Sequence, residues 1–265
     1  MAHAVSLMLV AVLGSAAALA QEAVPPEPLT DNSSTGQAMA AETPISPKQF
    51  VTNILLDQKP IFTFPWKVVK GRHWKPVAAV ALVTAGLVVL DPHTEPFFHD
   101  RAAFSSYKTG PLRGRNTTLA ITMTPVAFYL AGLVTHSSYD RNTGLLAAEG
   151  IIDTQLVSFV MKNAIGRLAP SSIPPNGNYR DTWFKYQGGF TNKGGFPSGH
   201  TASAFAVATV ISVRYRKHRW VPCVVYGAAT LLSLSRLPTQ AHFPSDIFLG
   251  AAMGYGIGRF VVMKN

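Results

Sequence analysis

Six apolar segments of 13 to 18 residues determine what this chain can fold into. They cover residues 76–90, 117–134, 145–161, 201–213, 221–234 and 247–263. None of them alternates apolar and polar residues as a half-buried strand does, and their lengths are those of helices. The sequence therefore predicts an all-α fold, a bundle of about six apolar helices.

The last apolar segment carries three glycines spaced four residues apart, Gly250, Gly254 and Gly258. Residues at this spacing share one face of a helix, and glycine lets two helix backbones approach closely. We expect this face to pack against a neighbouring helix.

The first 75 residues differ in composition from the rest. Residues 1–20 have the apolar run and the Ala18-Leu19-Ala20 ending of a cleaved signal peptide, although an uncleaved anchor is the alternative. Residues 21–47 are rich in Pro, Ser, Thr and Ala, which predicts a disordered linker. Residues 48–75 form an amphipathic, basic lead-in that includes a short helix from Pro47 to Gln58, and residues 76–265 form the helical domain.

Sequence signals conflict over whether the helices cross a membrane. Several apolar runs are shorter than the ~20 residues that a span needs, and the third contains Glu149 and Asp153. The basic clusters at 67–75 and 214–219 favour a membrane bundle with both clusters in the cytoplasm. A cleaved signal would instead place the first cluster outside. A membrane-embedded bundle is favoured over a soluble exported domain, but both stay open.

Composition excludes some classes of function. The net charge of +10 comes from scattered basic residues without a nucleic-acid motif, so an anionic substrate or an anionic membrane surface explains it better than DNA or RNA. The single cysteine, Cys223, excludes an intrachain disulfide and a multi-cysteine metal site. It lies in an apolar run, which predicts a buried thiol.

His242 and Asp246 are four residues apart at the predicted start of the last helix, with Pro244 in its first turn. A carboxylate that accepts the Nδ1 proton of a histidine leaves Nε2 free to attack phosphorus. The plainer alternative is a His–Asp pair that only caps the helix.

The tetrapeptide Pro197-Ser198-Gly199-His200 precedes another apolar helix. Unpaired N–H groups at a helix start favour a bound anion, and glycine lets the backbone approach it. His200 could protonate a leaving alkoxide. The alternative is a glycine turn with a serine cap and a surface histidine.

Two cations complete the pattern. Arg236 precedes His242 by six residues and can bind phosphate oxygens through two hydrogen bonds. Lys162 ends the third apolar helix, where it could clamp negative charge in a transition state or simply neutralise the helix terminus.

Together these residues resemble the type 2 phosphatidic acid phosphatase and vanadium haloperoxidase superfamily, with the motifs K-x6-R-P, P-S-G-H and S-R-x5-H-x3-D. The second motif matches fully at residues 197–200 and the third at residues 235–246. The first matches in part, because Lys162 is followed by Ala169 where the family has arginine, and then by Pro170. The resemblance covers roughly residues 70–262.

The resemblance implies a role for each matching residue. His242 would be the nucleophile, Asp246 its orienting partner and His200 the general acid. The phosphate would be held by Lys162, Arg236, Ser198 and the Gly199 backbone. The resemblance implies neither a metal nor a cofactor.

Ala169 removes a cation that can contribute on the order of 10²–10³ in rate. Arg167 lies two residues earlier and would reach the phosphate if the helix ends near Gly166. Arg180 and Lys185 are other substitutes. We expect retained but altered activity.

The function expected from this pattern is hydrolysis of phosphate monoesters or pyrophosphates, of lipids in preference to small esters, through a phosphohistidine. Alternatives are a soluble periplasmic acid phosphatase, a vanadate-dependent haloperoxidase and a degenerate, non-catalytic protein. The expected location is outside the cytoplasm, either in the bacterial inner membrane with the site facing the periplasm or in the periplasm. The sequence does not define an oligomeric state.

Overall fold

The computed structural model describes residues 42–99, 110–174, 177–185 and 194–264. The expected signal peptide and most of the expected linker lie outside these residues. The described residues are helical and include no strand, so the predicted all-α class is confirmed. The last residues of the expected linker are packed against the bundle: Asn142 donates to the Thr43 carbonyl, and Arg214 pairs with Glu42 at 2.6 Å.

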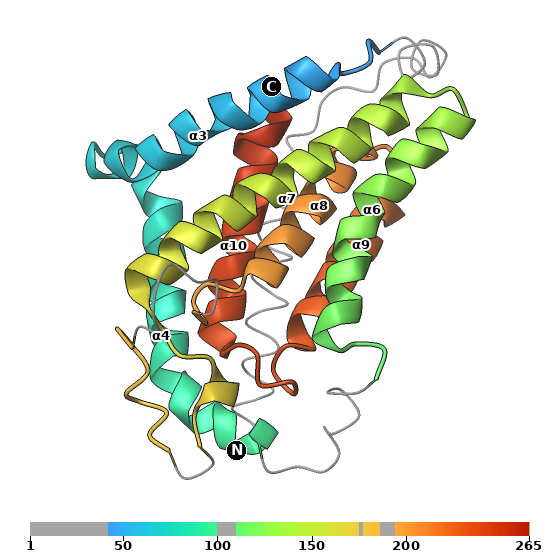
Figure 1. The fold of residues 1–265 in the computed structure, drawn as a ribbon. Helices are drawn as coiled ribbons and strands as arrows, with labels where there is room; N and C mark the ends of the chain where they lie inside the picture. The colour runs from blue at the N-terminus through green and yellow to red at the C-terminus, as the bar shows by residue number, and fades with distance from the viewer. Residues whose placement is uncertain (1–41, 100–109, 175–176, 186–193, 265) are drawn as a thin grey trace.

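Seven α-helices and two short 3₁₀ helices make up the described fold (Figure 1). The α-helices are α3 (Pro47–Val69), α4 (Trp74–His99), α6 (Gly114–Val134), α7 (Ser138–Ile165), α8 (Gly199–Arg214), α9 (Trp220–Leu234) and α10 (Pro244–Phe260); the 3₁₀ helices are η2 (Pro170–Ser172) and η3 (Val262–Lys264). The first five predicted apolar segments each lie in one helix, with further residues added at the ends, whereas the sixth, 247–263, runs from α10 into η3. Ser137 caps α7 by accepting a hydrogen bond from Asp140 N. The predicted helix Pro47–Gln58 continues to Val69.

Helix α8 lies at the centre of the bundle, packed against α7, α9 and α10 (Figure 1). Thirteen of its 16 residues are buried, and many are alanine or serine. Small side chains let three neighbouring helices approach one helix from different sides. The main hydrophobic core surrounds α8 and includes Leu146, Phe205, Val210, Ile211, Ile257 and Val262.

The predicted close approach of the glycine face is confirmed, and the neighbour is α8. A Cβ atom added to Gly254 would lie 2.1 Å from the Ala202 carbonyl oxygen, and one added to Gly250 would lie 2.6 Å from that of Ser198. Larger residues at either position would push the helices apart. The glycines therefore fix the start of α10 against the start of α8.

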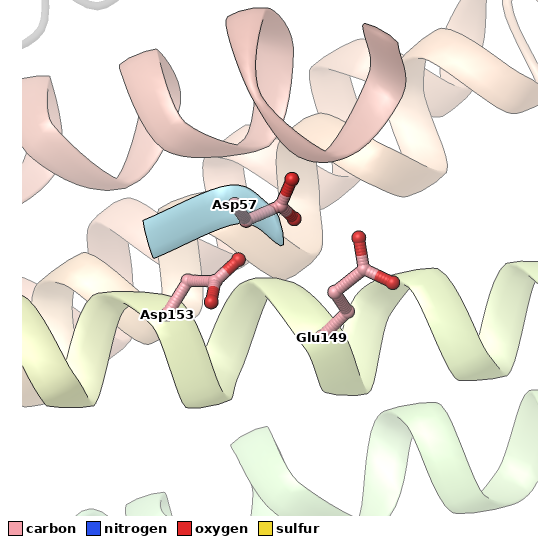
Figure 2. Close-up of side chains that lie close together, drawn as sticks. All are labelled: Asp57, Glu149 and Asp153. Carbon is pink, nitrogen blue, oxygen red and sulfur yellow. The ribbon is translucent and has the colours of Figure 1, made fainter. Parts of the chain in front are cut away.

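Helix α3 contacts the bundle through polar side chains. Along its whole described length, Asp57 is its one buried residue, and it faces Glu149 and Asp153 of α7 (Figure 2). One oxygen from each of these carboxyl groups lies within 4.8 Å of the others. Two α3 amides add hydrogen bonds: Gln58 donates to Asp153 at 2.7 Å and Asn53 to Glu149 at 3.4 Å. The two α7 carboxyl groups thus face protein, where lipid would have been costly.

Four helices are long and apolar enough to cross a membrane: α4, α6, α7 with its extension to Ser172, and α10 with its extension to Lys264. Large apolar side chains project outward from several helices, including Leu82 and Val89 on α4, Val134 on α6 and Leu231 on α9. Surfaces of this kind suit contact with lipid chains. The shorter helix α8 is instead enclosed by protein.

Candidate active site

Residues of the three sequence motifs gather at one end of the bundle (Figure 1). They come from the C-terminal end of α7, the N-terminal ends of α8 and α10, and the turn that follows α9. The close packing of α8 against α10 holds two of these ends together: Ser198 N donates to the Asp246 carbonyl at 3.0 Å. The site is therefore built from helix ends on one face, as the sequence predicts.

The Nδ1 atom of His242 is held by a backbone carbonyl. It lies 2.7 Å from the carbonyl oxygen of Gly195, so this nitrogen carries the proton that is donated. The Asp246 Oδ2 atom lies farther away, at 3.7 Å. The sequence assigned this hydrogen bond to Asp246, whereas the structure gives it to Gly195 and leaves Asp246 as a nearby charge. In both cases Nε2 is left without a proton and available for attack.

Asp246 uses its two oxygens for other contacts. Oδ2 accepts from the backbone N–H of Phe243 at 2.7 Å, which closes a cap at the start of α10. Oδ1 accepts from Nη1 of Arg167 at 2.6 Å. The carboxylate is fully buried. It therefore caps the helix, as the plainer alternative predicts, and also places a fixed negative charge beside His242.

His200 begins α8 and contacts α6. Its Nε2 atom lies 2.7 Å from the Thr118 hydroxyl, which itself donates to the Gly114 carbonyl at 2.9 Å. Since that hydroxyl has one proton, it accepts from Nε2–H. Burial, followed by the charges of His242, Arg236 and Lys162, lowers the pKa of His200 to about 4. Burial and neighbouring motif residues thus act on one imidazole, which is neutral near pH 7 when no anion is present.

Lys162 is 9% exposed as a residue, and its ammonium has no hydrogen-bond or ion-pair partner within the described part of the chain. Arg236 is 2% exposed and donates to the Leu112 carbonyl and, at 3.0 Å, to the Ser235 hydroxyl, both through Nη2. Its Nη1 atom lies next to Gly114, where an added Cβ would be 3.2 Å away. Burial lowers the pKa of Arg236. These buried cations suit an anionic ligand, because an unpaired buried charge is costly.

Ser198 and Gly199 form the start of α8. The Ser198 hydroxyl is completely buried and accepts from Thr201 N at 3.4 Å and Thr201 Oγ1 at 3.0 Å, so it caps the helix. Gln155 packs against Gly199, where a Cβ would lie 3.3 Å from its amide. The backbone amides at this terminus provide donors and a positive dipole for an anion.

Arg167 is buried away from bulk water and bonded to protein. Helix α7 does end at Gly166, in the left-handed conformation with φ of 60°, so the condition for Arg167 to turn inward is met. Its guanidinium then pairs with Asp246 and with Asp91, each at 2.6 Å, and is only 2% exposed as a residue. It lies 4.1 Å from the Phe243 ring centre. These contacts make it a structural cation and correct its expected role as a phosphate ligand.

The other proposed substitutes for the missing arginine lie at the surface. Lys185 pairs with Asp181 at 2.9 Å, and both side chains are exposed. Arg180 is exposed as well. Ala169 itself precedes η2 and lies beside Gly195, where an added Cβ would be 3.4 Å from its Cα atom. The described cations that face the site are therefore Lys162 and Arg236.

Known proteins are similar to the part of the chain that contains these residues. The sequence profile of the PAP2 superfamily matches residues 143–264, which contain the His242, His200 and Lys162 segments. The part of the chain that holds these segments is therefore similar to the PAP2 superfamily. No solved structure matches the chain significantly.

Several proteins that are similar to this chain are lipid A phosphatases by name. The chain is 32% identical to a lipid A 4'-phosphatase of Porphyromonas gingivalis over 44% of this chain and 48% of that protein. It is 27% identical to a lipid A 1-phosphatase of Rhizobium etli over 60% of this chain and 56% of that protein. A lipid A 4'-phosphatase of Bacteroides thetaiotaomicron is 31% identical over 40% of this chain and 46% of that protein. The chain spans about half the length of these relatives.

Sequence reasoning missed four residues around the site. Gly195 holds His242, Thr118 holds His200, and Asp91 and Ser245 bind Arg167. Gly195 and Ser245 adjoin motif residues and could have been suspected. Asp91 and Thr118 lie far from the motifs in the sequence, on helices that precede the matched region. The one available signal was their polar character, at the end of one apolar segment and within the next.

Proposed function

We propose that this protein is a phosphatase that hydrolyses phosphate esters or pyrophosphates of lipids through a covalent phosphohistidine. The observation that carries the proposal is the state of His242: a backbone carbonyl holds its Nδ1 proton and leaves Nε2 free. A free imidazole nitrogen among buried cations is suited to attack an anionic phosphorus centre, because the cations stabilise the negative charge that gathers on phosphate oxygens.

The proposed reaction has two steps. In the first, His242 Nε2 forms a bond to phosphorus, the ester P–O bond breaks and His200 donates a proton to the leaving oxygen. In the second, His200 accepts a proton from water, whose oxygen attacks phosphorus and breaks the N–P bond, which releases inorganic phosphate. Lys162, Arg236 and the α8 amides hold the phosphate throughout.

An anionic substrate would also prepare His200 for its role. In the free site, burial lowers the pKa of His200 to about 4, together with the charges of His242, Arg236 and Lys162. A bound phosphate offsets these positive charges and so raises the pKa. His200 then carries the acidic proton when substrate is present, with Nδ1 as the nitrogen left free by Thr118.

The substrate class that we propose is a phosphorylated glycolipid like lipid A. Two observations support a lipid: the relatives act on lipid A by name, and four helices have the length and composition of membrane spans. We place the protein in the bacterial inner membrane with the site facing the periplasm. The basic turns before α4 and after α8 lie at the helix ends away from the site, and basic turns favour the cytoplasmic side.

A substrate panel tests this proposal. Purified protein in detergent micelles should release phosphate from bisphosphorylated lipid A faster than from phosphatidate, prenyl pyrophosphate or an aryl phosphate, and vanadate should inhibit it. His242→Ala should abolish release, and rapid quenching should trap an acid-labile phosphoprotein in the unaltered protein only. Turnover that survives in His242→Ala would disprove the mechanism. A preference for soluble esters would support the soluble acid phosphatase alternative.

Two further outcomes would favour other functions. Peroxide-dependent halide oxidation with added vanadate would indicate a haloperoxidase. Folded protein that binds vanadate but hydrolyses none of the substrates would indicate a non-catalytic member, for which the alanine at position 169 is the reason to test.

A further inference from the structure

A buried network of charged and polar groups connects α4 to the catalytic end of the bundle. Arg167 lies at its centre, between two carboxylates: Nη2 donates to Asp91 Oδ2 and Nη1 to Asp246 Oδ1, both at 2.6 Å. All three residues are at most 2% exposed. Ion pairs of such short length and deep burial interact far more strongly than surface pairs.

Arg167 links Asp91 to Asp246, and Ser245 provides a second connection between Asp91 and the start of α10. Its hydroxyl donates to Asp91 Oδ2 at 2.5 Å and accepts from Arg167 Nη1 at 2.7 Å, while its backbone N–H donates to Asp91 Oδ1 at 3.2 Å. Both Asp91 oxygens are therefore bonded. Because Ser245 directly precedes Asp246 at the start of α10, Asp91 contacts the helix turn that positions Asp246 and His242.

We propose that Asp91 is a positioning residue for the reaction, holding Arg167 and the first turn of α10 so that Asp246 keeps a fixed place and negative charge beside His242. This inference rests on the proposed function. Asp91 lies in α4, which precedes the region matched by the PAP2 profile. The family motifs therefore depend on a residue outside them.

The charges explain why a second carboxylate is needed. Arg167 with Asp246 alone would form a neutral pair, and the field of Asp246 at His242, 3.7 Å away, would be largely cancelled. With Asp91, two negative charges share one positive charge, and a net negative charge remains beside the imidazole. Attack by Nε2 on phosphorus leaves the ring positively charged while Nδ1 keeps its proton, so this negative charge stabilises the transition state.

The charge at His242 is set by groups from five parts of the structure. Asp246 of α10 and His200 of α8 interact with His242 directly. The cations lie around these two groups: Arg167 after α7 pairs with Asp246, Lys162 of α7 interacts with Asp246 and His200, and Arg236 after α9 interacts with His200. Asp91 acts on the ring through Arg167 and Asp246.

Variants of opposite charge test the proposal. Asp91→Asn removes a negative charge, so the protonated ring becomes less stable: the acid limb of kcat/KM should move to lower pH by about 0.5–1 unit. Its kcat should fall about tenfold with KM changed less than twofold, because Asp91 does not touch the phosphate. Arg167→Gln should move the acid limb the other way. Loss of packing alone cannot give shifts of opposite sign.

A matched control and a milder variant keep the test decisive. Glu149→Gln removes an equally buried carboxyl group, 13 residues and so roughly 20 Å along α7 from Lys162, and should leave the acid limb unchanged. Ser245→Ala keeps all charges and removes one link. It should lower kcat about threefold to tenfold without moving the limb, and it serves if Asp91→Asn does not fold.

The failure of this inference can be told apart from failure of the proposed function. The ¹⁵N resonances of the His242 ring, assigned with His242→Ala, give a titration midpoint whether or not the protein turns over substrate. Folded Asp91→Asn with an unchanged midpoint, or Ser245→Ala with unaltered kcat, would overturn the positioning role. An inactive protein whose His242 midpoint still moves as described would remove the phosphatase proposal and keep the network.

Discussion

At the scale of single residues, the proposed phosphate site contains fewer cations than the family motif provides. Arg167 cannot replace the missing arginine, because Asp91 and Asp246 already bind its guanidinium on two sides. Moving it toward a phosphate would break a buried pair, which costs about 3–5 kcal/mol. The site therefore relies on Lys162, Arg236 and backbone amides.

Restoring the family arginine should strengthen this site. Ala169 is partly exposed and lies next to Gly195, so a long side chain can extend from it without displacing the core. We expect Ala169→Arg to tighten vanadate inhibition about tenfold to a hundredfold, since one more charge-assisted donor reaches the anion. Inhibition constants of the two proteins give the comparison, with Ala169→Gln as the uncharged control. Equal constants for all three would mean that position 169 does not face the anion.

His200 should make the stability of the free protein depend on pH. Its pKa is lowered to about 4 in the folded site from an ordinary 6.5, so the unfolded chain binds a proton more readily between these values. Stability that is fully present above pH 6.5 is then lost as the pH falls toward 4, by on the order of 1–3 kcal/mol. Thermal unfolding in detergent at several pH values measures this loss. His200→Gln should remove that part of the pH dependence, and a saturating phosphate analogue should reduce it.

The positions and contacts of the candidate site residues differed in how well the sequence could predict them. Motif spacing was enough to bring His200, Lys162 and Arg236 near His242, because each lies at a helix end whose position the apolar segments define. Spacing could not show that Gly195 would take the Nδ1 hydrogen bond, since a loop carbonyl has no sequence signature. Cys223 was predicted to be buried and is exposed, because α9 turns that side away from the protein core.

At the scale of helices, contact between α8 and α10 determines the site. The glycines of α10 bring Ser198 and Asp246 within one backbone hydrogen bond of each other. The sequence indicated that this glycine face would meet a helix. The sequence could not identify which helix this would be, because the other apolar segments are similar in composition.

A larger side chain at the α8–α10 contact should lower stability and activity more than a larger side chain on an open face of a helix. Gly254→Ala would place a Cβ atom 2.1 Å from the Ala202 carbonyl oxygen, so the helices must separate. We expect a loss of about 1–3 kcal/mol of stability together with a lower kcat. Gly227→Ala is the control, since a Cβ there meets nothing within 4 Å. Similar unfolding temperatures for both variants would contradict the close-packing argument.

At the scale of the whole molecule, the site and the basic turns lie at opposite ends of the bundle. The α8–α9 turn has three exposed basic residues, Arg216, Lys217 and Arg219. Arg115, at the end of the bundle that holds the site, is exposed as well. In the proposed inner-membrane orientation, the end with the site lies in the periplasm and the end with the basic turns lies in the cytoplasm.

Membrane-impermeant thiol labelling tests this orientation. In a Cys223→Ser background, Arg115→Cys should react in intact spheroplasts, and Lys217→Cys should react only after the membrane is broken. The two positions are both exposed, so accessibility within the protein does not distinguish them. The reverse pattern would place the site in the cytoplasm, and labelling of both would argue for a soluble protein.

The pairing of α3 with α7 has a consequence for how the chain enters a membrane. A carboxylate in the middle of an inserting helix raises the cost of insertion by about 2.5–3.5 kcal/mol on biological scales, and α7 carries two. Helix α3 is synthesised first and supplies Asn53 and Gln58 as donors to these groups. We expect α7 to enter the membrane only after α3 has docked against it. The hydropathy of α7 alone would then not determine when it inserts.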